Sequence, residues 1–523
     1  MFPQSSEILS LITMLFLLFF LTLSFYNPLR LFLSKDLTIK YLIPISVSST
    51  ILFLWPFYVL SILVIGQKFF ILAIILVNIF TFRSRNFWEL INSKPNIFDL
   101  IVLGAIIKSQ FAFNLKNYFL VHSDLTTHTL FLIQLKNSGI TFIDSLGFYP
   151  PGWYIFNSLF INFVSDQFIL RFLGPSLGVY FLLAVYLVFK YTNKYLSILL
   201  IMILLFPIPG SIAKFFFFPW PTQLTMMLVV FILDTFRNYF KQDTKFLFLF
   251  PIFFITLFLT NYYYGYLFII YSCLSLLLLI SWKKAFLTKF NLTIMITFFF
   301  SCSLGLINWA IKAKNSLKDI TLSATNIAIQ PSSQQTIQPS SQQIGQGTQK
   351  LAQEQDFGTL LLDLFFFSRN IPQSVIFTLL IILMIFLVRY KLSHTNILYI
   401  FFLLLIFCIT LLANLSGIFE VDSYLGRGIF FAVFALVLIL SFIKINPIFT
   451  HVLTVIFITI VFIFPPQVKF SPVDEFYHSY LLNQSKLNFD KIDCNQSLVP
   501  PNYNLSPDLM FIIFPKFCSK SSD

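Results

Sequence analysis

Residues 8 to 26 read ILSLITMLFLLFFLTLSFY, an apolar run without a single charged residue. As an α-helix, this run is long enough to cross the hydrocarbon core of a bilayer, which takes about 20 residues. No basic segment precedes it and no A-x-A-like cleavage site follows it, so we expect a retained membrane helix rather than a signal peptide. The sequence therefore predicts a first membrane span near the N-terminus.

Similar runs recur along the 523 residues. Hydrophobic residues make up 58% of the chain and charged residues 11%, and the mean hydropathy is +0.85. Soluble domains are about 45 to 50% apolar and about 25% charged, so this chain requires a bilayer as its solvent. The sequence predicts an all-α polytopic membrane protein with about 13 to 14 transmembrane helices. The candidate spans are 8–25, 41–65, 69–83, 98–113, 167–189, 195–212, 221–236, 246–262, 263–282, 290–311, 372–388, 396–415, 428–443 and 448–465.

The net charge of +13 is spread over short connections between these runs rather than gathered into one basic surface. Such a distribution indicates positive-inside topology and argues against a nucleic-acid partner. If the basic connections are cytoplasmic, the spans alternate, and residues 114–166, 312–371 and 466–523 fall on the external face. This alternation requires residues 153–165 to lie in the interface or to re-enter the membrane.

The chain is therefore expected to form one transmembrane domain, residues 1–465, and a small external C-terminal region, residues 466–523. Residues 329–344 repeat an eight-residue unit, IQPSSQQT followed by IQPSSQQI. Tandem Ser, Gln and Pro have nothing to bury, so we expect a disordered external loop over about residues 322–356.

The first external segment, 114–166, contains HSDLTTH, residues 122–128. In a helix Asp124 and His128 would share a face, and His122 flanks the carboxylate. A carboxylate near apolar surroundings becomes a stronger base, so the spacing fits an acid–base site. Asp124 could equally cap a short interfacial helix, and a capping aspartate can still act as a base.

About twenty residues later the chain reads YPPGWY, residues 149–154. The two prolines fix the backbone, and the glycine permits a close approach. Tyr149 and Trp153 suit either an interfacial turn or a stacking surface for a sugar ring. Tyr263, in NYYYGY, could also stack on a sugar, although an aromatic belt explains that stretch more simply.

An aspartate with a histidine four residues on, followed by YPPG leading into an apolar run, resembles the first external loop of GT-C glycosyltransferases. YPPGWY in particular looks like the arabinofuranosyltransferases that build mycobacterial cell walls and like related bacterial GT-C proteins. The resemblance covers about residues 114–165. It implies a GT-C-like bundle that transfers a sugar, usually with inversion, from a polyprenyl-phosphate donor to an acceptor hydroxyl at the external face.

The resemblance also implies site residues. Asp124 would be the general base on this resemblance. The residues themselves suggest that His128 assists and that His122, Tyr149, Trp153 and Tyr263 bind substrate. The family often has a double acidic motif, whereas Ser123 and Leu125 flank Asp124 here. This difference leaves a divalent cation open as a cofactor, and the five cysteines show no metal-ligand spacing.

A cation is needed for the leaving phosphate. Arg427 begins a late span and resembles the arginine that contacts the lipid phosphate in many GT-C enzymes. It could instead snorkel or pair with Glu420 or Asp422. Lys214, before FFFFPWP, and Arg171, just inside a span, are further candidates.

The expected partners are a polyprenyl-phosphate-linked sugar, a glycan, glycolipid or protein acceptor, and the lipid bilayer. The Phe, Ile, Lys and Asn bias suggests an AT-rich, bacterial genome, hence an inner membrane with its site on the periplasmic side. No Walker A or HExxH motif is present. The competing interpretation is a transporter or a lipid-linked glycan flippase or polymerase, although a transporter should carry its charges near mid-membrane on broken helices.

Overall fold

The structure is a computed structural model in which helices from residues before 306 pack with helices from residues after 390. The described residues are 5–84, 88, 96–116, 128, 131–133, 135–136, 149–194, 196–207, 216, 220–283, 289–307, 393–415, 425–442 and 447–464.

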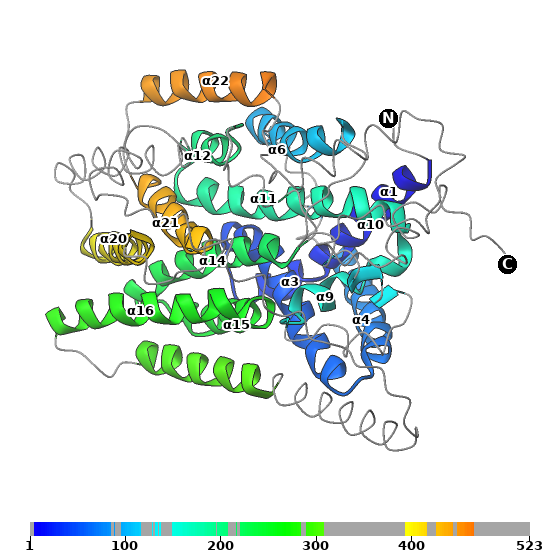
Figure 1. Ribbon diagram of the computed structural model, residues 1–523, viewed down its shortest axis with the longest axis horizontal. Coiled ribbons are helices and arrows are strands. Elements are labelled where there is room, and N and C mark those ends of the chain that lie inside the picture. The colour runs from blue at the N-terminus through cyan, green and yellow to red at the C-terminus, as the bar shows by residue number, and fades with distance from the viewer. Residues whose placement is uncertain are drawn as a thin grey trace, which may run out of the picture. The chain divides into compact units, whose positions relative to one another are not determined.

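Every regular element in this described part is a helix, and it contains no strand. Six helices are long and apolar enough to cross a membrane, and four more are apolar but shorter. The chain is thus an all-α polytopic membrane protein, as its composition predicted. The helices are α1 (Ser5–Ser24), α2 (Tyr26–Arg30), α3 (Lys35–Val59), α4 (Leu63–Arg83), α6 (Ile97–Lys116), α9 (Gly152–Asn157), the 3-10 helix η2 (Ile161–Phe163), α10 (Asp166–Arg171), α11 (Leu173–Thr192), α12 (Ser197–Leu204), α14 (Pro221–Phe240), α15 (Phe246–Thr260), α16 (Tyr262–Lys283), an unlabelled helix (Lys289–Ile307), α20 (His394–Leu415), α21 (Leu425–Leu440) and α22 (Pro447–Ile463) (Figure 1).

Most predicted spans coincide with a helix to within a few residues, but two differ. Of the span predicted at 195–212 the structure describes residues 196–207, and within these the helix α12 covers eight residues, about 12 Å of helix. The span predicted at 167–189 is divided at Phe172 into α10 and α11. The elements within 153–165 are too short to cross a bilayer, as the alternation required. The span predicted at 372–388 lies outside the described residues.

Helices α11 and α14 form the centre of the bundle. Figure 1 shows them running beside each other, and α11 also packs on α3 and α6, while α14 packs on α15. Every residue from Pro221 to Phe236 of α14 is buried. Because protein rather than lipid surrounds α14, this helix can carry polar residues such as Gln223 and Asp234.

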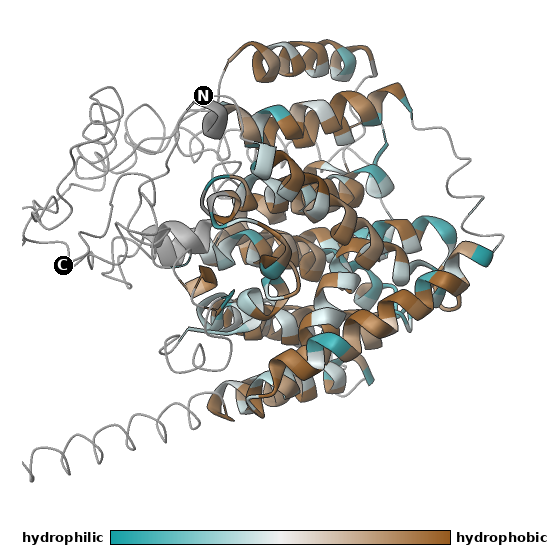
Figure 2. Ribbon diagram, turned by 90° about the vertical axis from the view of Figure 1, so that its right-hand side faces the viewer, coloured by the Kyte–Doolittle hydropathy of each residue, from teal (hydrophilic) through white to brown (hydrophobic). Residues whose placement is uncertain are grey.

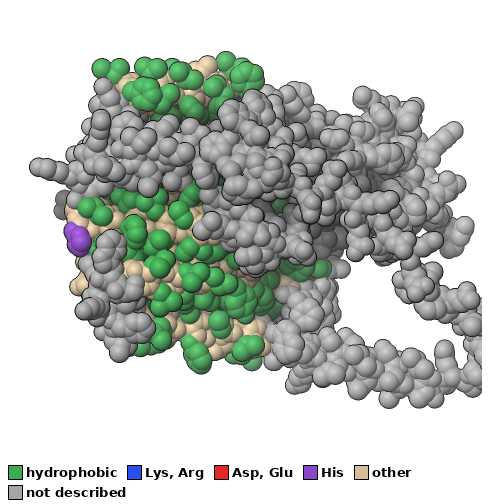
Figure 3. Space-filling model, turned by 60° about the vertical axis from the view of Figure 1, so that its left-hand side comes forward, with side chains coloured by type: hydrophobic (Ala, Val, Ile, Leu, Met, Phe, Trp, Pro, Cys, Tyr) green, Lys and Arg blue, Asp and Glu red, His purple; other side chains and the backbone are tan. Residues whose placement is uncertain are grey.

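The outer helices instead expose large apolar side chains. Phe80 of α4 is 68% exposed and Phe299 of the helix Lys289–Ile307 is 77% exposed. The described helices are mostly hydrophobic in Figure 2, and on the face drawn in Figure 3 no described side chain is coloured as charged. An apolar surface of this extent would associate in water, so lipid is its natural solvent.

Contacts between helix ends define one end of the bundle, here called the basic end. Lys40 near the start of α3 pairs with Asp234 near the end of α14. Lys190 near the end of α11 pairs with Asp99 at the start of α6. Lys40 lies before the span predicted at 41–65, but the helix begins earlier, at Lys35, and Lys40 is only 4% exposed.

The opposite end, here called the motif end, holds the YPPGW stretch. A Cβ at Gly152 would lie 2.9 Å from the carbonyl oxygen of Leu259 near the end of α15. The Tyr264 ring in the first turn of α16 stacks on Phe430 near the start of α21, with ring centroids 6.4 Å apart. The end of α15 and the starts of α16 and α21 therefore lie together at the motif end.

Near the motif end, α6, α11 and α14 meet around a buried polar contact. The side-chain amide of Gln223 donates to the carbonyl oxygens of Gly174, at 2.8 Å, and Phe216, at 2.5 Å. A Cβ at Gly178 would lie 2.3 Å from both the Phe216 carbonyl oxygen and the Gln110 Oε1 atom. The backbone of α11 can approach these groups only because Gly178 has no side chain.

We expect Gly178→Ala to lower the free energy of unfolding by about 1 to 3 kcal/mol, since the added methyl overpacks a filled site. The melting temperature of the purified chain in detergent measures this effect. Gly104→Ala is the matched control, because its Cβ would meet only the Phe462 ring at 3.6 Å. An unchanged melting temperature for Gly178→Ala would contradict the close approach.

Candidate functional site

The YPPGW turn lies directly against the α15–α16 connection. Helix α9 begins at Gly152, and the Ile155 amide donates to the Pro151 carbonyl at 2.9 Å in its first turn. A Cβ at Gly152 would lie 2.9 Å from both the Leu259 carbonyl oxygen and the Thr260 Oγ1 atom. The glycine thus permits the close backbone approach that the motif predicted.

His128 packs into this turn. Its Nδ1 atom shares a 2.5 Å hydrogen bond with the Tyr154 hydroxyl. Its ring meets Tyr149 edge-on at a centroid distance of 5.2 Å and lies 6.4 Å from the Trp153 ring. The structure therefore brings together three of the predicted site residues, His128, Tyr149 and Trp153, from two separate stretches of sequence.

Exposure differs sharply within this group. Tyr149 is 42% exposed, whereas His128 is 6% exposed and Trp153 and Tyr154 are fully buried. Burial raises the pKa of Tyr154 well above its ordinary value, and the nearby Tyr149 and Tyr58 add to the shift. The Tyr154 hydroxyl therefore keeps its proton at neutral pH. No role was predicted for Tyr154, although it ends the same YPPGWY motif.

The first turn of α16, which follows the α15–α16 connection, packs on the start of α21. Tyr264 stacks on Phe430 with an interplanar angle of 24°, and Tyr263 meets the Tyr264 ring edge-on at 5.8 Å. Arg427 lies in α21 three residues before Phe430, and only its backbone is described. The helix turn that carries Arg427 therefore lies at the motif end.

Arg171 is held by a partner that the sequence did not suggest. Its Nη1 atom lies 3.4 Å from Glu7 Oε2, and both side chains are buried, at 4% and 1% exposure. The guanidinium also lies over the Phe172 ring, 4.7 Å from its centroid. A buried charge balanced in this way favours a structural role, which weakens the prediction that Arg171 binds phosphate.

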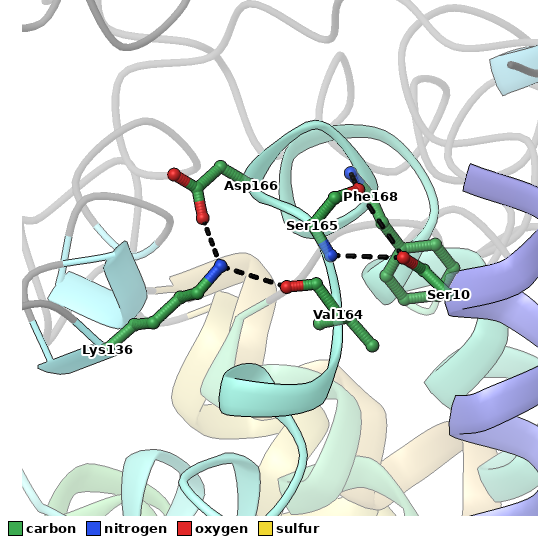
Figure 4. A network of polar contacts seen from close by, with 6 residues as sticks. All are labelled: Ser10, Lys136, Val164, Ser165, Asp166 and Phe168. Atoms are coloured by element: carbon green, nitrogen blue, oxygen red, sulfur yellow. Dashed lines mark hydrogen bonds and ion pairs between the residues drawn. The ribbon is translucent and has the colours of Figure 1, made fainter. Parts of the chain in front are cut away.

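A second polar network fixes the chain that follows the motif (Figure 4). The Ser165 amide donates to Ser10 Oγ of α1 at 3.0 Å, and the Ser165 side chain caps α10. Lys136 Nζ lies 2.5 Å from Asp166 Oδ1 and 2.9 Å from the Val164 carbonyl oxygen. These contacts join Lys136 and the stretch 164–166 to α1 and α10.

Three predicted site residues, His122, Asp124 and Lys214, lie outside the described residues. Within the described part of the chain, no three His, Cys, Asp or Glu residues are grouped so that they could hold a metal ion. The described side chains of the site are thus aromatic rings and hydrogen-bonding groups, namely an imidazole, two phenols and an indole. Of these four side chains Tyr149 is the exposed one, so its ring can stack on a sugar, while the other three support it from within the turn.

Comparison with protein-family models, with curated proteins and with solved structures found no match for the chain.

Proposed function

We propose that the chain is an integral-membrane glycosyltransferase of the GT-C type, with its active site at the motif end. The observation that supports this proposal most is the packing of His128 with Tyr149 and Trp153. These residues form an aromatic, hydrogen-bonding site beside the α15–α16 turn and at the same end as the start of α21. A site of this chemistry at a helix-bundle end suits a sugar whose carrier lies in the bilayer.

In the proposed reaction an acceptor hydroxyl attacks the anomeric carbon of a polyprenyl-phosphate sugar. Asp124 takes the hydroxyl proton as the new bond between carbon and oxygen forms. The bond from the anomeric carbon to the phosphate oxygen breaks, and polyprenyl phosphate leaves with inversion at carbon. Arg427 would stabilise the negative charge that grows on the phosphate. The acceptor is a hydroxyl of a cell-envelope glycan, lipid or protein.

The proposal places the motif end on the external side of a bacterial inner membrane. The clustering of Lys40, Lys190 and other basic residues at the opposite end supports this orientation through the positive-inside rule. Nucleotide sugars are not supplied on that side of the membrane, so a lipid-linked sugar is the donor expected there.

One observation favours the second candidate, a transporter or lipid-linked glycan flippase. The pair between Lys40 and Asp234 is buried within the bundle, and intramembrane charges often mark a transport pathway. The pair lies at the basic end, however, away from the aromatic group, whereas a transporter is expected to bind its substrate near the midplane.

The test is to reconstitute the purified chain in liposomes with a panel of radiolabelled polyprenyl-phosphate sugars and membrane-extracted acceptors. The proposal predicts labelled acceptor and one free polyprenyl phosphate for each sugar transferred. Movement of labelled lipid between leaflets, with the donor intact and no labelled acceptor, would contradict the proposal and favour the flippase.

A further inference from the structure

Two carboxylates near the end of α14 are each neutralised by a lysine. Asp234 Oδ2 lies 2.6 Å from Lys40 Nζ and also accepts a hydrogen bond from the Tyr41 hydroxyl. Asp243, in the connection after α14, pairs with Lys245, with its Oδ2 atom 2.9 Å from Nζ. Neither carboxylate is therefore left to balance a further cation at this end of the bundle.

Arg237 and Lys241 lie at the end of the same helix and have no carboxylate of their own. Within the described residues neither side chain forms an ion pair or a hydrogen bond. The Arg237 guanidinium lies over the Phe442 ring, 4.9 Å from its centroid, and this contact uses none of its N–H groups. The Arg237 Nε and Asn238 Nδ2 atoms are buried donors that lack a hydrogen-bond partner in this part of the chain. The end of α14 thus has an excess of positive charge and of donors.

These groups lie on one side of the helix. Positions 234, 237, 238 and 241 follow the i, i+3, i+4, i+7 spacing of a single helix face. Partial burial lowers the pKa of Lys241, and the charges of Arg237 and Lys40 lower it further. Asp234 and Asp243 act in the opposite direction but do not reverse the shift. The cations are therefore close enough to repel one another, and a negative ligand would relieve this repulsion.

The same end of α14 adjoins a helix that faces lipid. The Tyr239 hydroxyl donates to Asn291 Oδ1 at 2.5 Å, and Asn291 lies in the helix Lys289–Ile307, which exposes Phe299. Lys241 is itself exposed. Basic sites between helices at a membrane surface bind the headgroups of anionic lipids. A lipid is therefore a better match for this site than a free anion.

We propose that Arg237 and Lys241 bind the phosphate of an anionic lipid in the leaflet at the basic end. The guanidinium supplies charge and paired donors, and the ammonium adds a second charge. A phosphate offers the negative charge and the acceptor oxygens that this helix end lacks. The site lies at the end opposite the aromatic group, and the proposal does not depend on sugar transfer.

The test is native mass spectrometry of the full-length chain in a mild, uncharged detergent. The chain is titrated with phosphatidylglycerol and, separately, with phosphatidylcholine that has the same acyl chains. Wild type should bind phosphatidylglycerol at least about tenfold more tightly, since one hydrogen bond between charged groups contributes about that factor. Equal affinities for the two lipids would overturn the proposal.

Three glutamine variants locate the site. Arg237→Gln and Lys241→Gln should each lower the preference for phosphatidylglycerol by about tenfold. Lys241 is exposed, so its variant keeps the test valid if Arg237→Gln does not fold. Lys245→Gln is the matched control, because it removes the same charge from a lysine that Asp243 already pairs, and it should keep the preference within about twofold. Equal losses in all three variants would overturn the proposal, since net charge alone would then explain the preference.

Inorganic phosphate distinguishes a lipid from a free anion. Phosphatidylglycerol should raise the melting temperature of wild type in detergent, whereas sodium phosphate should not raise it above sodium chloride of equal ionic strength. A rise with sodium phosphate as large as that with phosphatidylglycerol, and absent in Lys241→Gln, would overturn the assignment to a lipid.

Discussion

Asp124→Asn is expected to lower the rate of sugar transfer by at least about a hundredfold, because general-base catalysis contributes about 10² to 10⁴ in rate. Asparagine keeps the shape of the side chain and much of its capping ability but cannot accept the acceptor's proton. The measurement is initial transfer rate at saturating donor, with wild type and variant purified in the same detergent.

Asp166→Asn is the matched control for this experiment. Asp166 belongs to the same segment of sequence, 114–166, and pairs with Lys136, but its side chain is 45% exposed, so its loss should leave both folding and transfer nearly unchanged. Transfer by Asp124→Asn at the wild-type rate would remove Asp124 from the chemistry. A loss in Asp166→Asn as large as in Asp124→Asn would show that the assay reports general damage to the loop.

Asp234→Leu is expected to produce the largest loss of stability, about 3 to 5 kcal/mol, because it leaves a buried ammonium without its partner. Lys40 Nζ lies 2.6 Å from Asp234 Oδ2, and both side chains are almost fully buried. The Tyr41 hydroxyl donates to the same oxygen at 2.6 Å, so two donors lose their acceptor. The melting temperature in detergent measures the loss.

Removing all three polar groups together should restore most of this stability. Lys40→Met and Tyr41→Phe, added to Asp234→Leu, replace the network with apolar groups of similar volume, a change that is often neutral or stabilising. A triple variant that melts as low as Asp234→Leu alone would contradict the view that the unpaired Lys40 charge causes the loss. Sugar transfer by a stable triple variant would also separate this cluster from catalysis.

Hydrophobic runs could predict the helices because the length of a membrane span is set by the bilayer. They could not predict where a helix breaks inside the protein, as at Phe172 between α10 and α11, or that α12 would be short. Those features depend on neighbouring helices, which replace lipid around the segment. For the same reason α14 carries Asp234, a residue that a lipid-facing helix would not hold.

The candidate site was only partly predictable. The spacing of HSDLTTH and YPPGWY selected His128, Tyr149 and Trp153, and the structure packs their side chains together. The hydrogen-bond partner of His128 and the ion-pair partner of Arg171 could not be predicted from the sequence. Nothing in the sequence distinguishes Tyr154 from the other aromatic residues around it. Glu7 lies 164 positions before Arg171 in the sequence, so no local pattern relates the two residues.

Photolabelling of the purified chain with a photoreactive polyprenyl-phosphate sugar tests most directly whether the motif end binds the donor. Labelled peptides, identified by mass spectrometry, should cover residues 149–157, 261–264 and 425–431, and excess unlabelled donor should suppress the labelling. Competed labelling confined to the basic end, around Lys40 and Lys190, or no competed labelling at the motif end, would contradict the account.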